Sequence, residues 1–139
     1  MSRADARHNA ARWLSTGRDD LTSAEILKDA GRHAHACFLA QQGAEKAVKA
    51  MWYMTDQDPW GHSVQRLLED LSQTVSLAEI QDLTVLAASL DKYYIPTRYP
   101  NGLPDLTPHK VYSASDSQNA ISSAEQLLAA AERFVSQRQ

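Results

Sequence analysis

Four of the five prolines lie in one short segment, and this segment limits what the chain can fold into. It reads YYIPTRYPNGLPDLTPHKVY from residue 93 to 112, with prolines at 96, 100, 104 and 108. Each proline removes a backbone N–H donor and disfavours helix at the preceding residue, so no continuous helix can cross the segment. Four of the five tyrosines lie here too. Ordered loops of this length are usually functional, so the sequence predicts a functional loop at 93–112.

The sequence before this loop has helical periodicity. The first helix is expected to end near Gly31, and its apolar positions are Ala10, Leu14, Leu21, Ala24 and Leu27. The second is expected from about residue 32 to 55 and has two apolar faces. One face is large (Ala34, Phe38, Val48, Trp52) and the other is small (Ala36, Ala40, Gly43, Ala47, Ala50). Small residues at this spacing allow close helix packing, so we expect this helix to be central, with Gln42, Lys46 and Lys49 facing solvent.

Two polar residues interrupt the large face of the second helix. Gln41 and Glu45 lie one turn apart among apolar positions. A buried amide or carboxylate without a partner is costly. The two residues therefore belong either to a hydrogen-bond network within the chain or to a site or subunit interface.

The remaining segments complete an all-α fold. Residues 58–61 form a turn by composition, and a short helix follows with Ser63 or His62 near its cap. A further helix is expected from about residue 76 to 94, and the last helix is expected to begin with Ser115 or Asp116 as its cap. We predict one domain over 1–139, an antiparallel up-and-down bundle of four long helices plus one short helix, with a long proline-rich loop before the last helix.

The overall composition excludes several classes of protein. The single cysteine, Cys37, rules out an internal disulfide, and its apolar helical face favours a buried thiol over a reactive one. The net charge of −3 gives no general sign of nucleic-acid binding. Four arginines between residues 3 and 18 form either a solvated face or an edge that faces phosphate. Neither a signal peptide nor an apolar span is apparent, so a cytoplasmic protein is expected.

Metal and cofactor chemistry has no support in the sequence. His33 and His35 are two residues apart, so they point in different directions on a helix, and no histidine pair has metal-ligand spacing. There is no glycine-rich phosphate loop, no Cys-x-x-Cys pair and no Gly-x-Ser-x-Gly motif. We therefore expect neither a metal nor a cofactor.

The candidate site residues gather around the proline-rich loop. Arg98 and His109 are the catalytic candidates, because an imidazole can move a proton while a guanidinium stabilises charge on a phosphate. Tyrosines can stack on bases. The candidate binding residues are Lys92, Tyr94, Tyr99, Tyr112, Glu45 and His62. Alternatively, Arg98 caps loop carbonyls, the tyrosines pack the loop down and His109 is merely exposed.

Three motifs in order resemble the HEPN family. They are AQQGAEKAVKA at 40–50, WGHSVQRLLEDL at 60–71 and LDKYYIPTRYPNG at 90–102, and the resemblance extends from about Trp13 to Phe134. HEPN domains are small helical domains implicated in nucleotide and RNA binding. This chain is most similar to short stand-alone prokaryotic members, which are often encoded beside a minimal nucleotidyltransferase and in some cases act as a toxin with its antitoxin.

The resemblance implies a homodimeric helical bundle. In nuclease members, an arginine followed four to six residues later by a histidine forms a metal-independent ribonuclease centre at the dimer interface. Here ten residues separate Arg98 from His109. We rank three functions in this order: a nucleotide- or RNA-binding module that acts with a nucleotidyltransferase, a metal-independent ribonuclease that uses Arg98 and His109, and a dimeric scaffold.

Overall fold

The computed structural model describes residues 2–138 and contains only helices and their connections in that range. The helices are α1 (Arg3–Asp29), α2 (His33–Met54), α3 (Val64–Leu71), α4 (Ile80–Asp91), α5 (Pro108–Val111) and α6 (Ala114–Gln137), with the 3₁₀ turn η1 (Pro100–Gly102). The predicted all-α bundle is confirmed, with α1, α2, α4 and α6 as its longer helices. Within residues 2–138, none of the helices combines the length and the apolar character that a membrane span requires.

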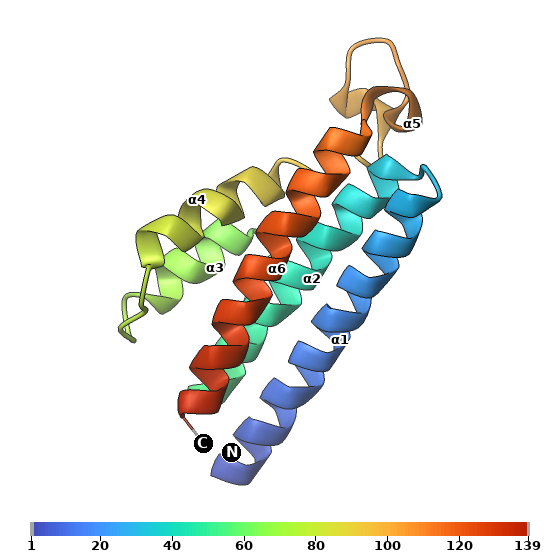
Figure 1. The fold of residues 1–139 in the computed structure, drawn as a ribbon. Coiled ribbons are helices and arrows are strands. Elements are labelled where there is room, and N and C mark those ends of the chain that lie inside the picture. The colour runs from blue at the N-terminus through green and yellow to red at the C-terminus, as the bar shows by residue number, and fades with distance from the viewer. Residues whose placement is uncertain (1, 139) are drawn as a thin grey trace.

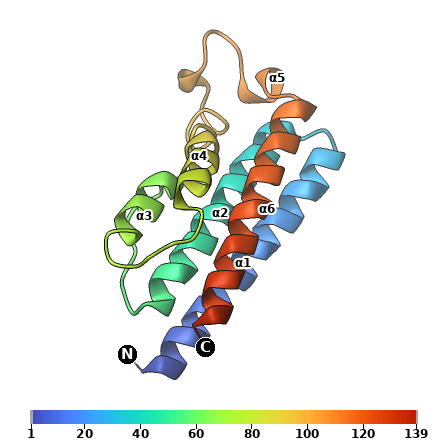
Figure 2. The ribbon, with the colours of Figure 1, turned by 60° about the vertical axis from the view of Figure 1, so that its left-hand side comes forward.

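The three longest helices form the body of the molecule (Figure 1). α1, α2 and α6 run side by side, and α3 and α4 pack together along one flank. The segment between α4 and α6, which contains η1 and α5, extends beyond one end of the bundle, whereas the start of α1 and the end of α6 lie near the other (Figures 1 and 2). The proline-rich loop therefore covers a single end of the bundle.

α2 is the central helix, as the sequence predicts. It packs against α1, α3, α4 and α6, and its small face is buried at Ala36, Ala40, Gly43, Ala47 and Ala50. α1 crosses this face so closely that a Cβ atom added to Gly43 would lie 2.8 Å from the carbonyl oxygen of Gly17. Only glycine at both positions permits this contact, which explains the small face of α2.

Gln42, Lys46 and Lys49, the solvent-facing positions expected from the sequence, are the three positions between residues 40 and 50 that are not fully buried, and both lysines are also ion-paired. Lys46 Nζ lies 2.5 Å from Asp20 Oδ2 on α1, and Lys49 Nζ lies 3.2 Å from Glu45 Oε2 one turn earlier on α2. The Lys49 side chain is only 12% exposed. Because α2 is covered on most sides, its two partly exposed lysines are held in ion pairs.

The expected ends of two later helices also differ from the structure. α4 spans Ile80–Asp91 rather than 76–94, because Glu79 adopts a left-handed conformation at φ 59° before the first turn. α6 is capped by Ser113, whose side chain accepts a hydrogen bond from the backbone N–H of Asp116 while the Asp116 carboxylate accepts one from the backbone N–H of Ser113. This reciprocal capping box starts the helix earlier than the expected caps, Ser115 or Asp116.

The proline-rich loop has more local structure than the sequence suggests. Pro100 begins the turn η1 and Pro108 begins the single helical turn α5, since proline suits the first position of a helix, where its missing N–H is not needed. The loop is closed at its base, where the rings of Tyr93 and Tyr112 meet edge to face at 5.9 Å between centroids. The loop is thus an ordered structure with fixed ends.

Candidate functional site

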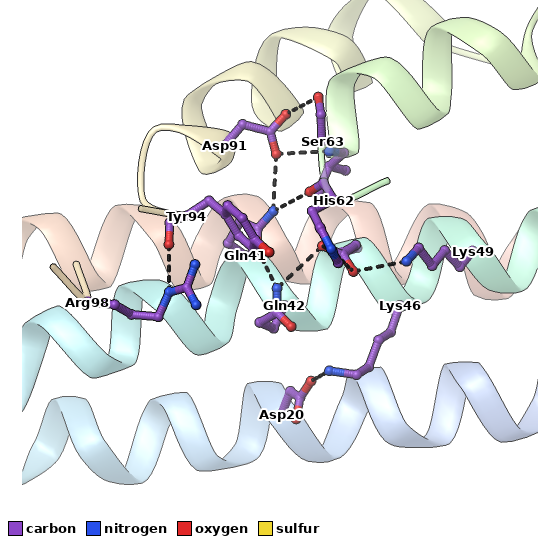
Figure 3. A network of polar contacts seen from close by, with 12 residues as sticks. Asp20, Gln41, Gln42, Lys46, Lys49, His62, Ser63, Asp91, Tyr94 and Arg98 are labelled. Carbon is purple, nitrogen blue, oxygen red and sulfur yellow. Dashed lines mark hydrogen bonds and ion pairs between the residues drawn. The ribbon is translucent and has the colours of Figure 1, made fainter. Parts of the chain in front are cut away.

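Arg98 lies on a platform of aromatic rings. Its guanidinium carbon is 4.4 Å from the ring centroid of Phe38, 4.5 Å from that of Tyr94 and 5.1 Å from that of Tyr99. Its Nε atom donates a hydrogen bond to the carbonyl oxygen of Tyr94 at 2.8 Å (Figure 3). The Nε bond and the rings fix the direction of the guanidinium. Its two terminal nitrogens have no partner within residues 2–138, so they can bind a ligand.

A cavity of about 410 Å³ lies beside this arginine. Its lining includes Arg98 and His109 from the loop together with Arg32 and His35 at the start of α2. The ten residues between Arg98 and His109 therefore do not keep them on separate surfaces. The cavity lies within the size range of small-ligand sites. Its polar lining consists of two arginines, two histidines and Thr97, without a carboxylate.

The start of α2 contributes a backbone charge to the same cavity. Ala34 and His35, in the first turn of α2, line it, and Arg32, the residue before the helix, makes no side-chain cap. A helix of this length carries a partial positive charge at its N-terminus and presents unpaired N–H groups there. Arginine side chains beside such a terminus form an environment suited to phosphate or carboxylate.

His109 is exposed at the edge of this cavity. Its Nδ1 atom is 3.2 Å from the hydroxyl of Thr107, which fixes one side of the ring. The imidazole can therefore exchange a proton with a bound molecule through Nε2. His109 has the chemistry of a proton donor or acceptor, and its catalytic role stays a prediction.

A polar network that is buried at Gln41 and Glu45 adjoins the aromatic platform at Tyr94 (Figure 3). The ring of His62 stacks on Tyr94 at 5.2 Å between centroids, and His62 Nδ1 lies 3.4 Å from the Glu45 carboxylate. Gln41 donates to the carbonyl oxygen of His62 at 2.9 Å and to Asp91 Oδ1 at 3.2 Å. Gln41 and Glu45 thus have partners within the chain, which agrees with the first of the two interpretations of the sequence, a hydrogen-bond network within the chain.

Asp91 joins three helices within this network. Its carboxylate accepts hydrogen bonds from the Ser63 hydroxyl at 2.8 Å and from the backbone N–H groups of Val64 and Gln65 at 2.9 and 3.0 Å. It also accepts the Gln41 bond, so one side chain at the end of α4 caps α3 and holds α2. Tyr94 follows three residues later, and the network therefore fixes the start of the loop that carries Arg98.

The other sequence candidates lie outside the cavity. Lys92 is exposed at the C-cap of α4, and Tyr112 packs on Tyr93 at the base of the loop. Burial raises the pKa of both Tyr93 and Tyr112. Cys37 is buried beside them, and burial raises the pKa of its thiol to about 12, which leaves no reactive thiolate. Among residues 2–138, no three His, Cys, Asp or Glu side chains are placed to hold a metal ion.

Sequence reasoning missed three residues of the site. Arg32 received no role, His35 was considered only as a metal ligand, and Phe38 was assigned to the buried face of α2, whereas it is half-buried beneath Arg98. The position of Arg32 immediately after the helix-ending Gly31 and before α2 was the available signal, because a basic residue at a helix start is unfavourable for the helix dipole unless it has another role.

Comparison with known proteins identifies the family. The HEPN domain profile matches residues 10–134, which is most of the chain. The chain belongs to the HEPN family. No curated protein matches this HEPN chain.

Solved structures agree with the family assignment. TT1696 from Thermus thermophilus is 40% identical to this HEPN chain with a TM-score of 0.85, over 91% of this chain and 98% of TT1696. ST0689, an archaeal HEPN homologue, is 30% identical with a TM-score of 0.77 over 91% and 98% of the two chains. A HEPN domain protein from Thermotoga maritima, TM0613, is 30% identical with a TM-score of 0.71 over 90% and 98%.

Proposed function

We propose that this HEPN protein binds the phosphate of a nucleotide or of RNA in the cavity between the start of α2 and the proline-rich loop. The observation that carries the proposal is the gathering of Arg32, His35, Arg98 and His109 around one cavity at an uncapped helix N-terminus. The terminal nitrogens of Arg98 suit a bidentate contact with two phosphate oxygens. Tyr99, which is 49% exposed beside Arg98, offers a ring on which a base can stack.

Replacement of Arg98 tests this proposal. In a titration of fluorescein-labelled single-stranded RNA followed by anisotropy, with ATP as competitor, Arg98→Ala is expected to weaken binding roughly 10- to 100-fold, the value of one charge-assisted contact. The matched control is Arg66→Ala, because Arg66 is exposed and its side chain pairs, among the described residues, only with Asp70 on α3. Equal binding by wild type and Arg98→Ala, for both RNA and ATP, would contradict the proposal.

A second candidate function, metal-independent RNA cleavage, is favoured by the presence of Arg98 and His109 on one cavity. In this mechanism His109 transfers a proton to or from the ribose 2′-hydroxyl, and Arg98 stabilises the charge on the phosphate. His109→Ala is expected to lower cleavage by about 10²–10⁴-fold with little change in RNA affinity, and cleavage is expected to persist in EDTA. If purified wild type cleaves no faster than His109→Ala, the protein is a binding module only.

The proposed module acts as a homodimer and with a minimal nucleotidyltransferase as partner, in a toxin–antitoxin-like pair. Exposed apolar side chains near the site support an interface there, because Ile95, Tyr99 and Leu106 in the loop are each about half exposed. Gln41 and Glu45 give no such support, since their partners are internal. Light scattering at micromolar concentration distinguishes a dimer from a monomer of 15.4 kDa.

A further inference from the structure

A second and larger cavity lies at the other end of the bundle. Its volume is about 620 Å³, and it lies between the last turns of α6 and the connection from α3 to α4. It shares no lining residue with the phosphate cavity. Along α2, its lining residue Met51 is 17 positions from Ala34 of the first cavity, a separation of roughly 25 Å at 1.5 Å per residue. The two cavities are therefore separate sites.

The inner part of this second cavity is apolar. Met51 and Leu83 belong to the hydrophobic core and are only 3% and 6% exposed, and Leu77 and Phe134 are partly buried around them. A ligand that enters this cavity covers the apolar surface that Leu77 and Phe134 leave accessible, and each of its methylene groups that is buried there tightens binding by roughly fourfold. The volume is in the range of small-molecule sites. This lining suits an alkyl or aromatic group.

The charged lining of the cavity has a net positive sign. Arg133 lines it from the last turns of α6 and Arg138 lines it as the C-cap residue of that helix, and neither makes an ion pair within residues 2–138. The guanidinium of Arg138 lies over the Phe134 ring at 4.3 Å from its centroid, which places a cation directly beside the apolar surface. Among the described residues of the lining, Glu79 is the one with a carboxylate side chain. The two arginines and the one glutamate together carry one net positive charge, which favours an anionic ligand.

We propose that this second cavity binds a small organic anion with an apolar body, a carboxylate or a phosphate monoester that carries an alkyl or aromatic group. The apolar body lies on Leu77 and Phe134, and the anionic head lies between the guanidinium groups of Arg133 and Arg138. The proposal does not depend on the phosphate cavity, because neither residues nor elements of the loop contribute to it.

Four probe molecules test the proposed ligand class with the whole chain. Octanoate and octyl phosphate carry both the apolar body and the anion, acetate lacks the apolar body, and octylammonium reverses the charge. By calorimetric titration, the first two are expected to bind at least about tenfold more tightly than the last two. Amide chemical-shift changes in ¹⁵N-labelled protein are expected around Leu83 and Phe134. Shift changes confined to the loop around Arg98, or equal binding of octylammonium, would overturn the proposal.

Two variants locate the binding energy. Arg133→Gln combined with Arg138→Gln is expected to weaken octanoate binding by roughly tenfold or more. The control Arg12→Gln, at an exposed arginine of α1 that does not line the cavity, is expected to leave it unchanged. Ala130→Trp, which fills the cavity from α6, is expected to abolish octanoate binding. If Ala130→Trp fails to fold, the double arginine variant still tests whether octanoate binds in this cavity. Octanoate affinity within about twofold of wild type in the pair variant, or no binding of octanoate to wild type at millimolar concentration, refutes the site.

Discussion

The crossing of α1 and α2 makes a sharp prediction about Gly43. A Cβ atom there would lie 2.8 Å from the carbonyl oxygen of Gly17, closer than real side chains approach a backbone, so the two helices must separate. Gly43→Ala gains about 1 kcal/mol of helix propensity, while overpacking costs roughly 1–3 kcal/mol. The expected net loss for alanine is therefore about 0–2 kcal/mol.

Leucine at position 43 adds further carbon atoms between α2 and α1, where the backbone of α1 already lies in contact distance. The neighbouring atoms are Asp20 Cβ and the Leu21 backbone nitrogen, both at 3.6 Å from the added Cβ. Gly43→Leu is expected to lower the free energy of unfolding by roughly 3 kcal/mol or more, and the melting temperature by roughly 10 °C or more. Thermal melts followed by circular dichroism measure this.

The control is Ser15→Leu, because Ser15 is exposed on α1 two residues before Gly17. This change is expected to alter stability by no more than about 0.5 kcal/mol. A double variant, Gly17→Ala with Gly43→Ala, should lose less than the sum of the single losses, since one separation of the helices relieves both contacts. If Gly43→Leu melts within a degree or two of wild type, the close crossing does not exist.

Two further predictions concern buried polar groups. Asp91→Ala removes the acceptor for four hydrogen bonds and deprives buried Gln41 of one of its partners, so the free energy of unfolding measured by urea denaturation is expected to fall by roughly 2–4 kcal/mol. The control is Asp70→Ala, on the exposed side of α3, which is expected to change it by no more than about 0.5 kcal/mol. Equal losses in the two variants would contradict the role of the network. Burial raises the pKa of Cys37 from 9.0 to about 12, so between these values the unfolded thiol ionises while the folded thiol keeps its proton, and stability is expected to fall as pH rises through this window. Cys37→Ala should flatten that decline, and an unchanged slope would show that the thiol is not protonated preferentially in the folded state.

The helices and their core faces were predictable, because each depends on spacing along a single segment. The small face of α2 and the end of α1 near Gly31 both follow from local pattern, and both are confirmed. The pairing of Lys46 with Asp20 was not predictable, since it depends on which face of α1 meets α2.

The site was only partly predictable for the same reason. Arg98 and His109 belong to one conspicuous loop, so the sequence could select them. Arg32 and His35 come from a helix start about 60 residues earlier, and only the fold brings that helix end to the loop. Phe38 lies at a position where the helical spacing of apolar residues predicts a core side chain. A single sequence does not distinguish an aromatic ring that contacts a guanidinium group from one that packs in the core.

The contact between Tyr93 and Tyr112 bears on how the separation of Arg98 and His109 should be interpreted. This contact fixes the two ends of the loop, so the packing of the helices does not depend on how many residues lie between those ends. The entropy of closing a flexible loop grows only with the logarithm of its length, about 0.6 kcal/mol for each doubling. A histidine eleven residues after the arginine, in place of four to six, therefore costs roughly 1 kcal/mol or less, about the value of one hydrogen bond. In a loop anchored in this way, sequence spacing is a weak guide to which side chains act together.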